Sequence, residues 1–322
     1  MSEKMPFGLG ATLYSFNIDY YTYRRTMEDC MAALASLGPG QGVEVVAPMM
    51  DRGYPSVSPE FEARLKNALE KYELVPTCYS GYADPQRITG RYTTYEEQKE
   101  YLLLQLNAAK TLGFPVLRVQ PCRTLLDLAP YAEKAGVKIT YEIHAPMRVE
   151  DHPLAQQIIE LDNPWVGFVP DCGTFCRAPS DVYFKRFADQ GVPQEIADCI
   201  RALWAKGCTQ DEIRAEVKKL AYNDVIALMV TESTEYFGHS DPAAMIPVMK
   251  FIPHIHGKFF YVDDAGTESA VRLPEVVAAL KQGGFTGYIS SEYEGHHWYA
   301  DTDALDQIRR HQAVIRRCFA EA

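Results

Sequence analysis

Residues 138–146 read KITYEIHAP, a short run of strand-forming residues that ends in the polar side chains of Glu142 and His144. Residues 166–173, VGFVPDCG, follow the same plan, with Asp171 closing the apolar run. Apolar runs rich in β-branched and aromatic residues predict buried strands. An amphipathic stretch separates the two runs, which is the rhythm of a βα unit in a parallel sheet.

The same rhythm extends along the whole chain. We expect eight strands, at residues 7–13, 43–47, 74–78, 116–120, 138–144, 166–170, 255–262 and 288–293. Helix start signals lie between them, at Ser58-Pro59, at the capping box from Thr94 to Glu97, and at Leu273-Pro274. Eight strands interleaved with helices favour an α/β fold of the closed (β/α)₈ TIM barrel type over a doubly wound sheet.

One gap breaks this rhythm. About 85 positions separate Pro170 from Ile255, whereas a βα step takes roughly 30 residues. Helical patterns near 181–189, 194–206 and 210–222 lie within the gap, and the structure of 223–251 is left open. We therefore expect residues 1–322 to form a single TIM-barrel domain with a helical insertion at about 174–253. Because it follows the sixth strand, the insertion should rise from the active-site face, as a lid or a partner-docking surface.

Composition excludes several classes of function. The 322 residues contain 32 Lys and Arg against 43 Asp and Glu, a formal charge of −11, which disfavours nucleic acid as a partner. No apolar run approaches 18 residues, so we expect no membrane span, and the first residues do not follow the plan of a signal peptide. The eight cysteines form no C-x-x-C pair and are expected to be reduced in a cytoplasmic protein.

Four successive strands close in a potential metal ligand: Glu142, Asp171, His256 and Glu292. In TIM barrels the active site is built at the carboxyl ends of the strands, so these four side chains should converge. Three carboxylates and one imidazole suit Mn²⁺, or alternatively Mg²⁺ or another divalent metal, better than a structural zinc site. The alternative is that each is an isolated polar group bonded to a neighbouring loop.

His144 is a candidate catalytic base. It lies two residues from Glu142, and residues i and i+2 of a strand point to the same side, so the base and a metal ligand would share one site. An imidazole with an ordinary pKa near 6.5 can accept a proton at neutral pH. The alternative is a core histidine that donates to a strand-end carbonyl.

Four further side chains are candidate substrate contacts: Tyr14, Tyr79, His254 and Lys258. The tyrosines, with Tyr82 nearby, lie at the ends of the first and third strands, where their rings could stack on a sugar or an aromatic group. His254 could instead be packed one layer deeper, and Lys258 could pair with Asp263 or Asp264. Glu44 lies among apolar residues of the second strand, and we expect it to be the buried partner of a loop amide.

The spacing of the four ligands, with the H-x-H pair at 254–256 and the S-E pair at 291–292, resembles the sugar isomerase and epimerase superfamily with the xylose-isomerase-type barrel. The resemblance implies that the matching residues hold one divalent metal, commonly manganese, which binds neighbouring oxygens of a carbonyl sugar. The chain departs from the ketose 3-epimerases at Thr174, where they carry a histidine, and at 257–260, where they carry an arginine after the metal-binding histidine.

A narrower resemblance rests on the motifs EIHAP at 142–146, GVEVVAP at 42–48, GYP at 53–55, AEKAGVK at 132–138 and DNPWVGFVPDCGTF at 162–175. These look like the catalytic subunit of the bacterial C-glycoside deglycosidases. That family breaks the carbon–carbon bond between a 3-oxo sugar and an aromatic aglycone. The resemblance therefore implies a small-molecule 3-oxo-glycoside as substrate and a hetero-oligomer with a smaller beta subunit.

The chemistry of such a substrate explains why a metal and a base would be needed. A C-glycoside has no glycosidic oxygen to protonate, so the two-carboxylate route of glycosidases is closed. A ketone at carbon 3 makes the proton on carbon 2 acidic, and its removal lets the aglycone leave from carbon 1 by β-elimination. His144 is then the expected base, with Glu142 and Glu292 beside it. The alternatives are a ketose epimerase or isomerase that uses those two carboxylates as paired proton carriers, or a non-catalytic sugar-binding or assembly module.

Overall fold

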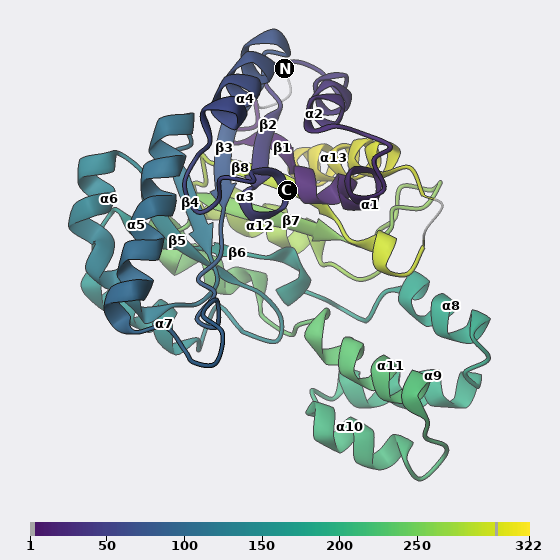
Figure 1. Ribbon diagram of the computed structural model, residues 1–322. Coiled ribbons are helices and arrows are strands. Elements are labelled where there is room, and N and C mark those ends of the chain that lie inside the picture. The colour runs from purple at the N-terminus through teal and green to yellow at the C-terminus, as the bar shows by residue number, and fades with distance from the viewer. Residues whose placement is uncertain (1–3, 300–301) are drawn as a thin grey trace.

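The computed structural model describes residues 4–299 and 302–322, and it shows eight parallel strands surrounded by helices (Figure 1). The strands are β1 (Gly8–Thr12), β2 (Gly42–Val46), β3 (Val75–Ser80), β4 (Val116–Val119), β5 (Lys138–Ile143), β6 (Val166–Pro170), β7 (His254–Phe259) and β8 (Tyr288–Tyr293). They form one sheet in the order β6-β5-β4-β3-β2-β1-β8-β7. All eight strands predicted from the sequence are confirmed, with ends that differ by a few residues.

The two outer strands of that order, β6 and β7, meet at a bridge between Asp171 and His256, which nearly closes the sheet into a barrel. The predicted (β/α)₈ TIM barrel is therefore confirmed. Because all eight strands are parallel, their carboxyl ends open on one face, where the chemistry of such barrels is located.

Close packing between β1 and β2 depends on glycine. Gly10 pairs with Gly42 across the two strands, and a Cβ added to Gly10 would lie 2.1 Å from the carbonyl oxygen of Gly42. Any side chain at residue 10 would therefore force the strands apart.

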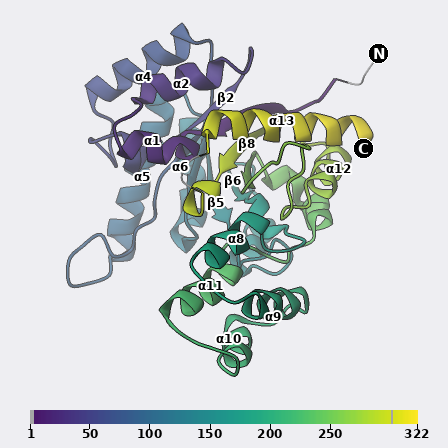
Figure 2. The same ribbon diagram turned by 90° about the vertical axis from the view of Figure 1, so that its right-hand side faces the viewer.

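The outer layer consists of helices that follow the strands (Figures 1 and 2). They are α2 (Met27–Ala35), α4 (Pro59–Lys71), α5 (Tyr95–Leu112), α6 (Ala129–Ala135), α7 (Pro153–Leu161), α12 (Leu273–Gly283) and α13 (Ala304–Glu321). The predicted start signals are confirmed: Ser58 caps α4, and Thr94 and Glu97 form a reciprocal capping box on α5. Short elements fill the loops at the carboxyl ends, among them α1 (Asn17–Tyr21) after β1 and α3 (Ala47–Met50) after β2.

The expected helical insertion lies between β6 and β7. It contains α8 (Asp181–Asp189), α9 (Gln194–Ala205), α10 (Gln210–Val217), α11 (Asp224–Glu235) and the 3-10 helix η4 (Pro242–Phe251), so residues 223–251 are also largely helical. Figures 1 and 2 show α9, α10 and α11 projecting away from the barrel.

Aromatic contacts anchor the insertion to the carboxyl-end face. Tyr183 of α8 packs edge to face against Trp298, which follows β8, with ring centroids 5.4 Å apart. Phe237 stacks on the same indole at 5.6 Å, and Arg186 donates a hydrogen bond to the carbonyl of His297 at 2.7 Å. The insertion is thus attached to the loop that follows the eighth strand, on the face where the predicted ligands end their strands.

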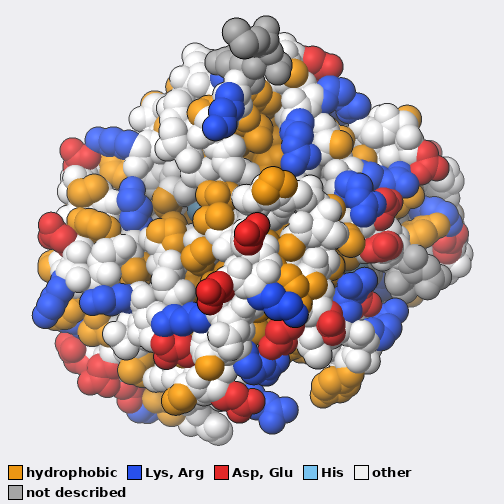
Figure 3. Space-filling model, turned by 90° about the horizontal axis from the view of Figure 1, so that it is seen from above, with side chains coloured by type: hydrophobic (Ala, Val, Ile, Leu, Met, Phe, Trp, Pro, Cys, Tyr) orange, Lys and Arg blue, Asp and Glu red, His pale blue; other side chains and the backbone are white. Residues whose placement is uncertain are grey.

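The surface carries charges of both signs. On the face seen in Figure 3, acidic and basic side chains are interspersed with hydrophobic ones. Within the described residues, none of the helices combines the length and apolar character needed to cross a membrane.

Glu268, in the loop between β7 and α12, is a buried carboxyl group away from the barrel centre. Its oxygens accept the backbone N–H groups of Val271 and Phe260. Burial raises the pKa of Glu268 to about 7, and these hydrogen bonds offset only part of that effect. The ionised form is therefore costly in the folded chain.

We expect Glu268→Gln to make the free energy of unfolding fall less between pH 5 and pH 8, by about 2 kcal/mol, because Gln has no proton to lose in this range. The folded chain keeps this proton up to a pH of about 7, whereas the unfolded chain releases it near 4.5, so the contribution of Glu268 to stability falls as the pH rises between those values. Urea unfolding at both pH values measures the difference, with Glu60→Gln on the exposed face of α4 as the control. An equal effect at both pH values would contradict the raised pKa.

Candidate metal centre and active site

A cavity with a volume of about 210 Å³ opens at the carboxyl ends of the strands. Its walls are formed by Tyr14, Glu44, Val46, Tyr82, Arg118, Gln120, Glu142, His144, Lys258, Glu292 and Glu294. These side chains come from most of the strands and from the loops that follow them. The lining is rich in charged and hydrogen-bonding groups, which suits a hydroxylated ring better than an apolar ligand.

The structure brings the four predicted metal ligands together. Glu142, Asp171, His256 and Glu292 each offer one ligand atom, and these atoms all lie within 4.8 Å of one another. All four side chains are buried. His256 Nδ1 lies 2.5 Å from Glu142 Oε1 and 3.5 Å from Glu292 Oε2. Glu142 and Glu292 of this cluster also line the cavity.

The electrostatics of the cluster fit a bound cation. Glu292 Oε2 is buried without a hydrogen-bond donor among the described residues, and Asp171 Oδ2 faces the ammonium of Lys258 at 2.9 Å. Burial raises the pKa of Glu292 well above its usual range, because an isolated buried carboxylate is costly. A divalent ion among the four ligand atoms would compensate that charge, and an oxygen-rich set with one imidazole suits Mn²⁺ or Mg²⁺.

Glu44 supports this cluster from one layer below. It is fully buried, and its carboxylate is bonded by His256 Nε2 at 2.8 Å, by His254 Nε2 at 3.0 Å and by the hydroxyl of Ser80 at 2.6 Å. The prediction that Glu44 pairs with a loop amide is therefore wrong. Its bond to Nε2 turns Nδ1 of His256 toward the other ligands, as second-layer carboxylates do at metal sites.

His254 lies in the same deeper layer, bonded to Glu44, and the structure does not place it in the cavity wall. Glu44, Cys78 and His254 also form a compact group of potential ligands. Because Glu44 bonds to Nε2 of His256, which is itself a member of the four-ligand cluster, we assign this group the role of orienting His256.

Lys258 extends into the cavity as a buried cation. Its Nζ lies 2.9 Å from Asp171 Oδ2, 3.4 Å from Glu294 Oε1 and 2.6 Å from His144 Nε2. Burial alone would lower the pKa of Lys258, but Asp171 and Glu294 outweigh it and hold the pKa well above the usual range. The side chain is therefore an ammonium ion that bridges the ligand cluster and the candidate base.

These contacts correct the alternative that Lys258 pairs with Asp263 or Asp264. Asp264 instead faces Arg310 at 2.7 Å, and Asp263 accepts the backbone N–H of Thr267. The strand direction explains the difference, because Lys258 lies two residues from His256 and points with it into the barrel.

The tautomer of His144 follows from its neighbours. Nδ1 lies 2.7 Å from the carbonyl oxygen of Ala145, which can only accept, so Nδ1 carries the hydrogen. Nε2 then holds the lone pair and faces Lys258 in the cavity. The ring makes the carbonyl hydrogen bond considered as an alternative and lines the cavity as well.

Sequence reasoning missed two charged groups in the cavity. Arg118, on β4, lies with Nη2 2.9 Å from Glu142 Oε2. Burial would raise the pKa of Glu142, but Arg118 and then His256 outweigh it and keep the pKa well below the usual range. Glu294 is buried just after β8. An arginine inside an apolar strand, and a carboxylate two residues after Glu292, were the signals that could have identified them.

The structure separates the three tyrosines considered as ring contacts. Tyr14 lines the cavity, with its ring 5.6 Å from that of His296. Tyr79 does not reach the cavity: it is fully buried against Phe114 in the outer core, because its strand neighbours point inward and it points to the helices. Tyr82, three residues further on, lines the cavity instead.

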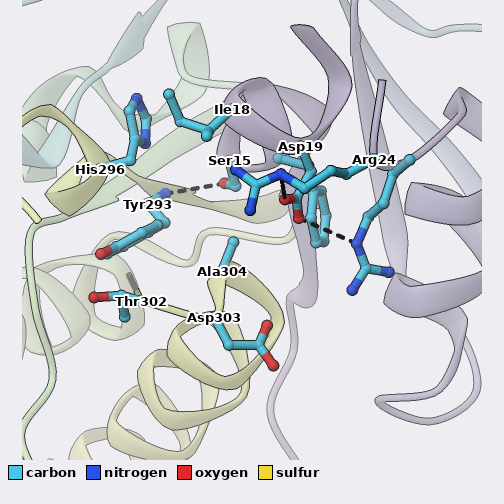
Figure 4. A pocket seen from close by; sticks show the side chains of 11 residues that line it. Ser15, Ile18, Asp19, Arg24, Tyr293, His296, Thr302, Asp303 and Ala304 are labelled. Carbon is cyan, nitrogen blue, oxygen red and sulfur yellow. Dashed lines mark hydrogen bonds and ion pairs between the residues drawn. The ribbon is translucent and has the colours of Figure 1, made fainter. Parts of the chain in front are cut away.

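A second hollow, with a volume of about 340 Å³, lies beside His296, between the segment after β1 and the start of α13 (Figure 4). The carboxylate of Asp19 lies between the guanidinium groups of Arg24 and Arg25, at 3.4 and 3.1 Å. These charges compensate one another, and the described lining residues contain no cluster of metal ligands. We therefore place the chemistry in the central cavity.

Comparisons with known proteins agree with the barrel fold. Residues 31–318 match the family model described as a xylose isomerase-like TIM barrel. The chain is 32% identical to the 3'-dehydrocarminate deglycosidase alpha subunit of a Microbacterium species, over 97% of this chain and 95% of that protein. It is 30% identical to a C-glycoside deglycosidase alpha subunit of Arthrobacter globiformis, over 98% of this chain and 93% of the relative.

Solved structures show the same fold at low sequence identity. A D-psicose 3-epimerase from Clostridium cellulolyticum H10 aligns with a TM-score of 0.59 and 12% identity, over 97% of this chain and 99% of that one. A sugar phosphate isomerase/epimerase from Parabacteroides distasonis aligns with a TM-score of 0.57 and 11% identity, over 99% and 97% of the two chains.

We expect Glu292→Gln to weaken Mn²⁺ binding by about 100-fold or more, because it removes a charged ligand from the cluster. Glu294→Gln is the matched control, since Glu294 is equally buried and lies two residues away but is outside the ligand cluster. Isothermal titration of the metal-free protein with Mn²⁺ measures both variants. Equal losses in the two variants would contradict the assignment of the ligands.

We expect Glu44→Gln to weaken Mn²⁺ binding by about 10- to 100-fold, because it removes the negative charge that orients His256. Ser80→Ala, which removes a hydrogen bond to Glu44 without touching His256, should have a smaller effect. The same titration applies, with circular dichroism of the metal-free proteins as the check on folding. An unchanged Mn²⁺ affinity in a folded Glu44→Gln protein would count against this role.

Proposed function

The chain belongs to the xylose isomerase-like TIM barrel family, and we propose that it acts there as a divalent-metal-dependent lyase on 3-oxo-C-glucosides. The family, and relatives that are named C-glycoside deglycosidase alpha subunits, support a sugar-modifying enzyme. The proposed reaction breaks the bond between the anomeric carbon of the sugar and an aromatic carbon of the aglycone. By the same relationship, we propose that the chain works with a smaller beta subunit.

The observation that carries the proposal is the lone pair of His144 Nε2 in a cavity that also contains the ligand cluster. In the proposed reaction, this nitrogen takes the proton from carbon 2 of the sugar. The electrons of that bond pass onto the carbon-3 oxygen as an enolate and return to form the double bond between carbons 1 and 2. The bond to the aglycone breaks with its electron pair going to the aglycone carbon, and this carbon gains one proton, equal in number to the proton that His144 removes from carbon 2.

The four ligand residues would hold the cation, which supplies Lewis-acid stabilisation of negative charge on the carbon-3 oxygen. Arg118 contributes beside Glu142, with which it is paired. Its guanidinium lines the cavity and has more donors than the one that faces Glu142, so it can also bind a substrate oxygen.

Lys258 and Glu294 lie near His144 and affect the charge that its ring can carry. Substrate carbon 2 would replace the ammonium at Nε2, while Lys258 keeps its contacts with Asp171 and Glu294. Burial would raise the pKa of Glu294, but Lys258 and nearby histidines outweigh it and lower the pKa. Glu294 is therefore an anion that can compensate the imidazolium formed by proton transfer.

The geometry favours this route over ketose epimerisation with Glu142 and Glu292 as paired proton carriers. Glu142 Oε1 lies 2.5 Å from His256 Nδ1, and Glu142 Oε2 lies 2.9 Å from Arg118 Nη2. With both oxygens engaged and the pKa lowered, Glu142 is poorly suited to carry a proton.

We expect His144→Gln to reduce cleavage of a 3-oxo-C-glucoside by about 1,000-fold while Mn²⁺ affinity stays within about threefold, because the base is lost and the ligands remain. Cleavage is followed chromatographically with the Mn²⁺-loaded chain and its partner subunit, and exchange of the carbon-2 hydrogen by NMR in D₂O should be lost in parallel. His152→Gln is the control, since His152 bonds to Tyr141 away from the cavity.

Two results would contradict the proposal. One is a His144→Gln protein that still cleaves the substrate at the rate of the unaltered protein. The other is an unaltered, metal-loaded complex that leaves 3-oxo-C-glucosides intact and epimerises a free ketose.

A further inference from the structure

A third hollow, with a volume of about 530 Å³, lies on the rim of the barrel. We call it the tyrosine pocket, defined by residues 20–27 after β1, residues 48–52 after β2 and Arg64 of α4. Both loop segments follow strands at their carboxyl ends, so the tyrosine pocket and the central cavity open on the same face of the barrel.

Three tyrosines line this pocket together with methionines and arginines, and two of the three are exposed. Tyr21 is 62% exposed and Tyr23 is 92% exposed, and Tyr20 packs edge to face against Tyr21 with centroids 6.1 Å apart. Tyr23 also has a left-handed backbone, with φ of 58°, which is unfavourable for a bulky residue. The fold gains little from aromatic rings at these positions, whereas a flat ligand would gain stacking surfaces.

The pocket also offers an unpaired positive charge. Arg25 pairs with Asp19 at 3.1 Å, and Arg64 pairs with Glu28 at 2.7 Å. Arg52 is exposed and makes no hydrogen bond or ion pair with any residue that the structure describes. A guanidinium of this kind binds a carboxylate or phenolate in its own plane.

The pocket adjoins the central cavity. Val46 lines the cavity, and the chain passes from it directly through Ala47 to the pocket residues Pro48–Met50. Tyr82 also lines the cavity; burial raises its pKa, and the nearby Tyr21 adds to the rise. The walls of the cavity and of the tyrosine pocket are therefore neighbouring segments of the chain at the end of β2.

The volumes of the two hollows indicate which half of the proposed substrate each of them could hold. The central cavity, at about 210 Å³, is smaller than the roughly 300–1,000 Å³ of typical ligand sites, and its lining is strongly polar. It is suited to one sugar ring, so a large aromatic substituent must lie outside it. The tyrosine pocket falls within the typical range and has the stacking surface that the cavity lacks.

We propose that the tyrosine pocket binds the aglycone half of the substrate, and that it selects planar aromatic groups with an acidic substituent. Tyr21 and Tyr23 provide the stacking faces, and Arg52 pairs with the acidic group. The link to the sugar half rests on the proposed function, whereas binding of an aromatic acid to the pocket does not.

The test uses 2-naphthoate as the probe and uncharged 2-naphthalenemethanol as its comparison, with the Mn²⁺-loaded full-length chain. Titration followed by NMR should show naphthoate binding at least tenfold more tightly than the alcohol. Arg52→Gln should abolish that preference, and Tyr21→Ala and Tyr23→Ala should each weaken both probes about tenfold. Tyr131→Ala, on the exposed side of α6, is the matched control and should change neither affinity.

Naphthoate affinities that are the same in the unaltered, Tyr21→Ala and Tyr23→Ala proteins would overturn the proposal. Glu292→Gln should leave naphthoate binding intact, because it alters only the metal cluster. If naphthoate binds with the expected preference and the expected effects of the variants, but a 3-oxo-C-glucoside is not cleaved, the proposed function is refuted and the pocket proposal is supported. Cleavage with an unchanged KM in Tyr23→Ala, together with absent naphthoate binding, would refute the pocket and leave the function standing.

Discussion

Compensation of buried negative charge governs the centre of this barrel. Five carboxylates, Glu44, Glu142, Asp171, Glu292 and Glu294, are buried at or below the carboxyl ends of the strands. Arg118, Lys258 and His256 offset part of that charge at distances of 2.5 to 3.5 Å. Oε2 of Glu292, one of the four converging ligands, has no hydrogen-bond donor among the described residues, and a divalent cation is the group that best compensates the ionised form of this cluster.

The same residues connect the chemistry to the fold. The barrel closes between β6 and β7 at the bridge from Asp171 to His256, both of which belong to the ligand cluster. The helical insertion begins after β6 and ends before β7, so it connects the two strands at which the barrel closes. Its aromatic anchor at Trp298 fixes it to the segment after β8, which also carries Glu294. The insertion and the cavity therefore share the segment that follows β8.

The carboxyl-end face of the barrel therefore offers two surfaces of different chemistry. Charged groups line a small central cavity and suit a sugar. The neighbouring rim carries exposed tyrosines and Arg52, which has no ion-pair partner among the residues described. Tyr82, at 38% exposure, adds an aromatic ring to the wall of the cavity. A substrate with one polar and one flat aromatic half would match both surfaces, and the bond between the halves would lie near His144.

The sequence alone determined the eight strands and the convergence of the four ligands, because side-chain periodicity and strand ends are local features that parallel pairing carries to one face. Only the tertiary structure decided which partners those residues meet. Glu44 bonds to His256, which lies 212 positions later in the sequence. Lys258 pairs with Asp171 and not with Asp264, which is closer to it in sequence. Strand pairing and barrel closure bring these side chains together, and local sequence does not encode distances between strands.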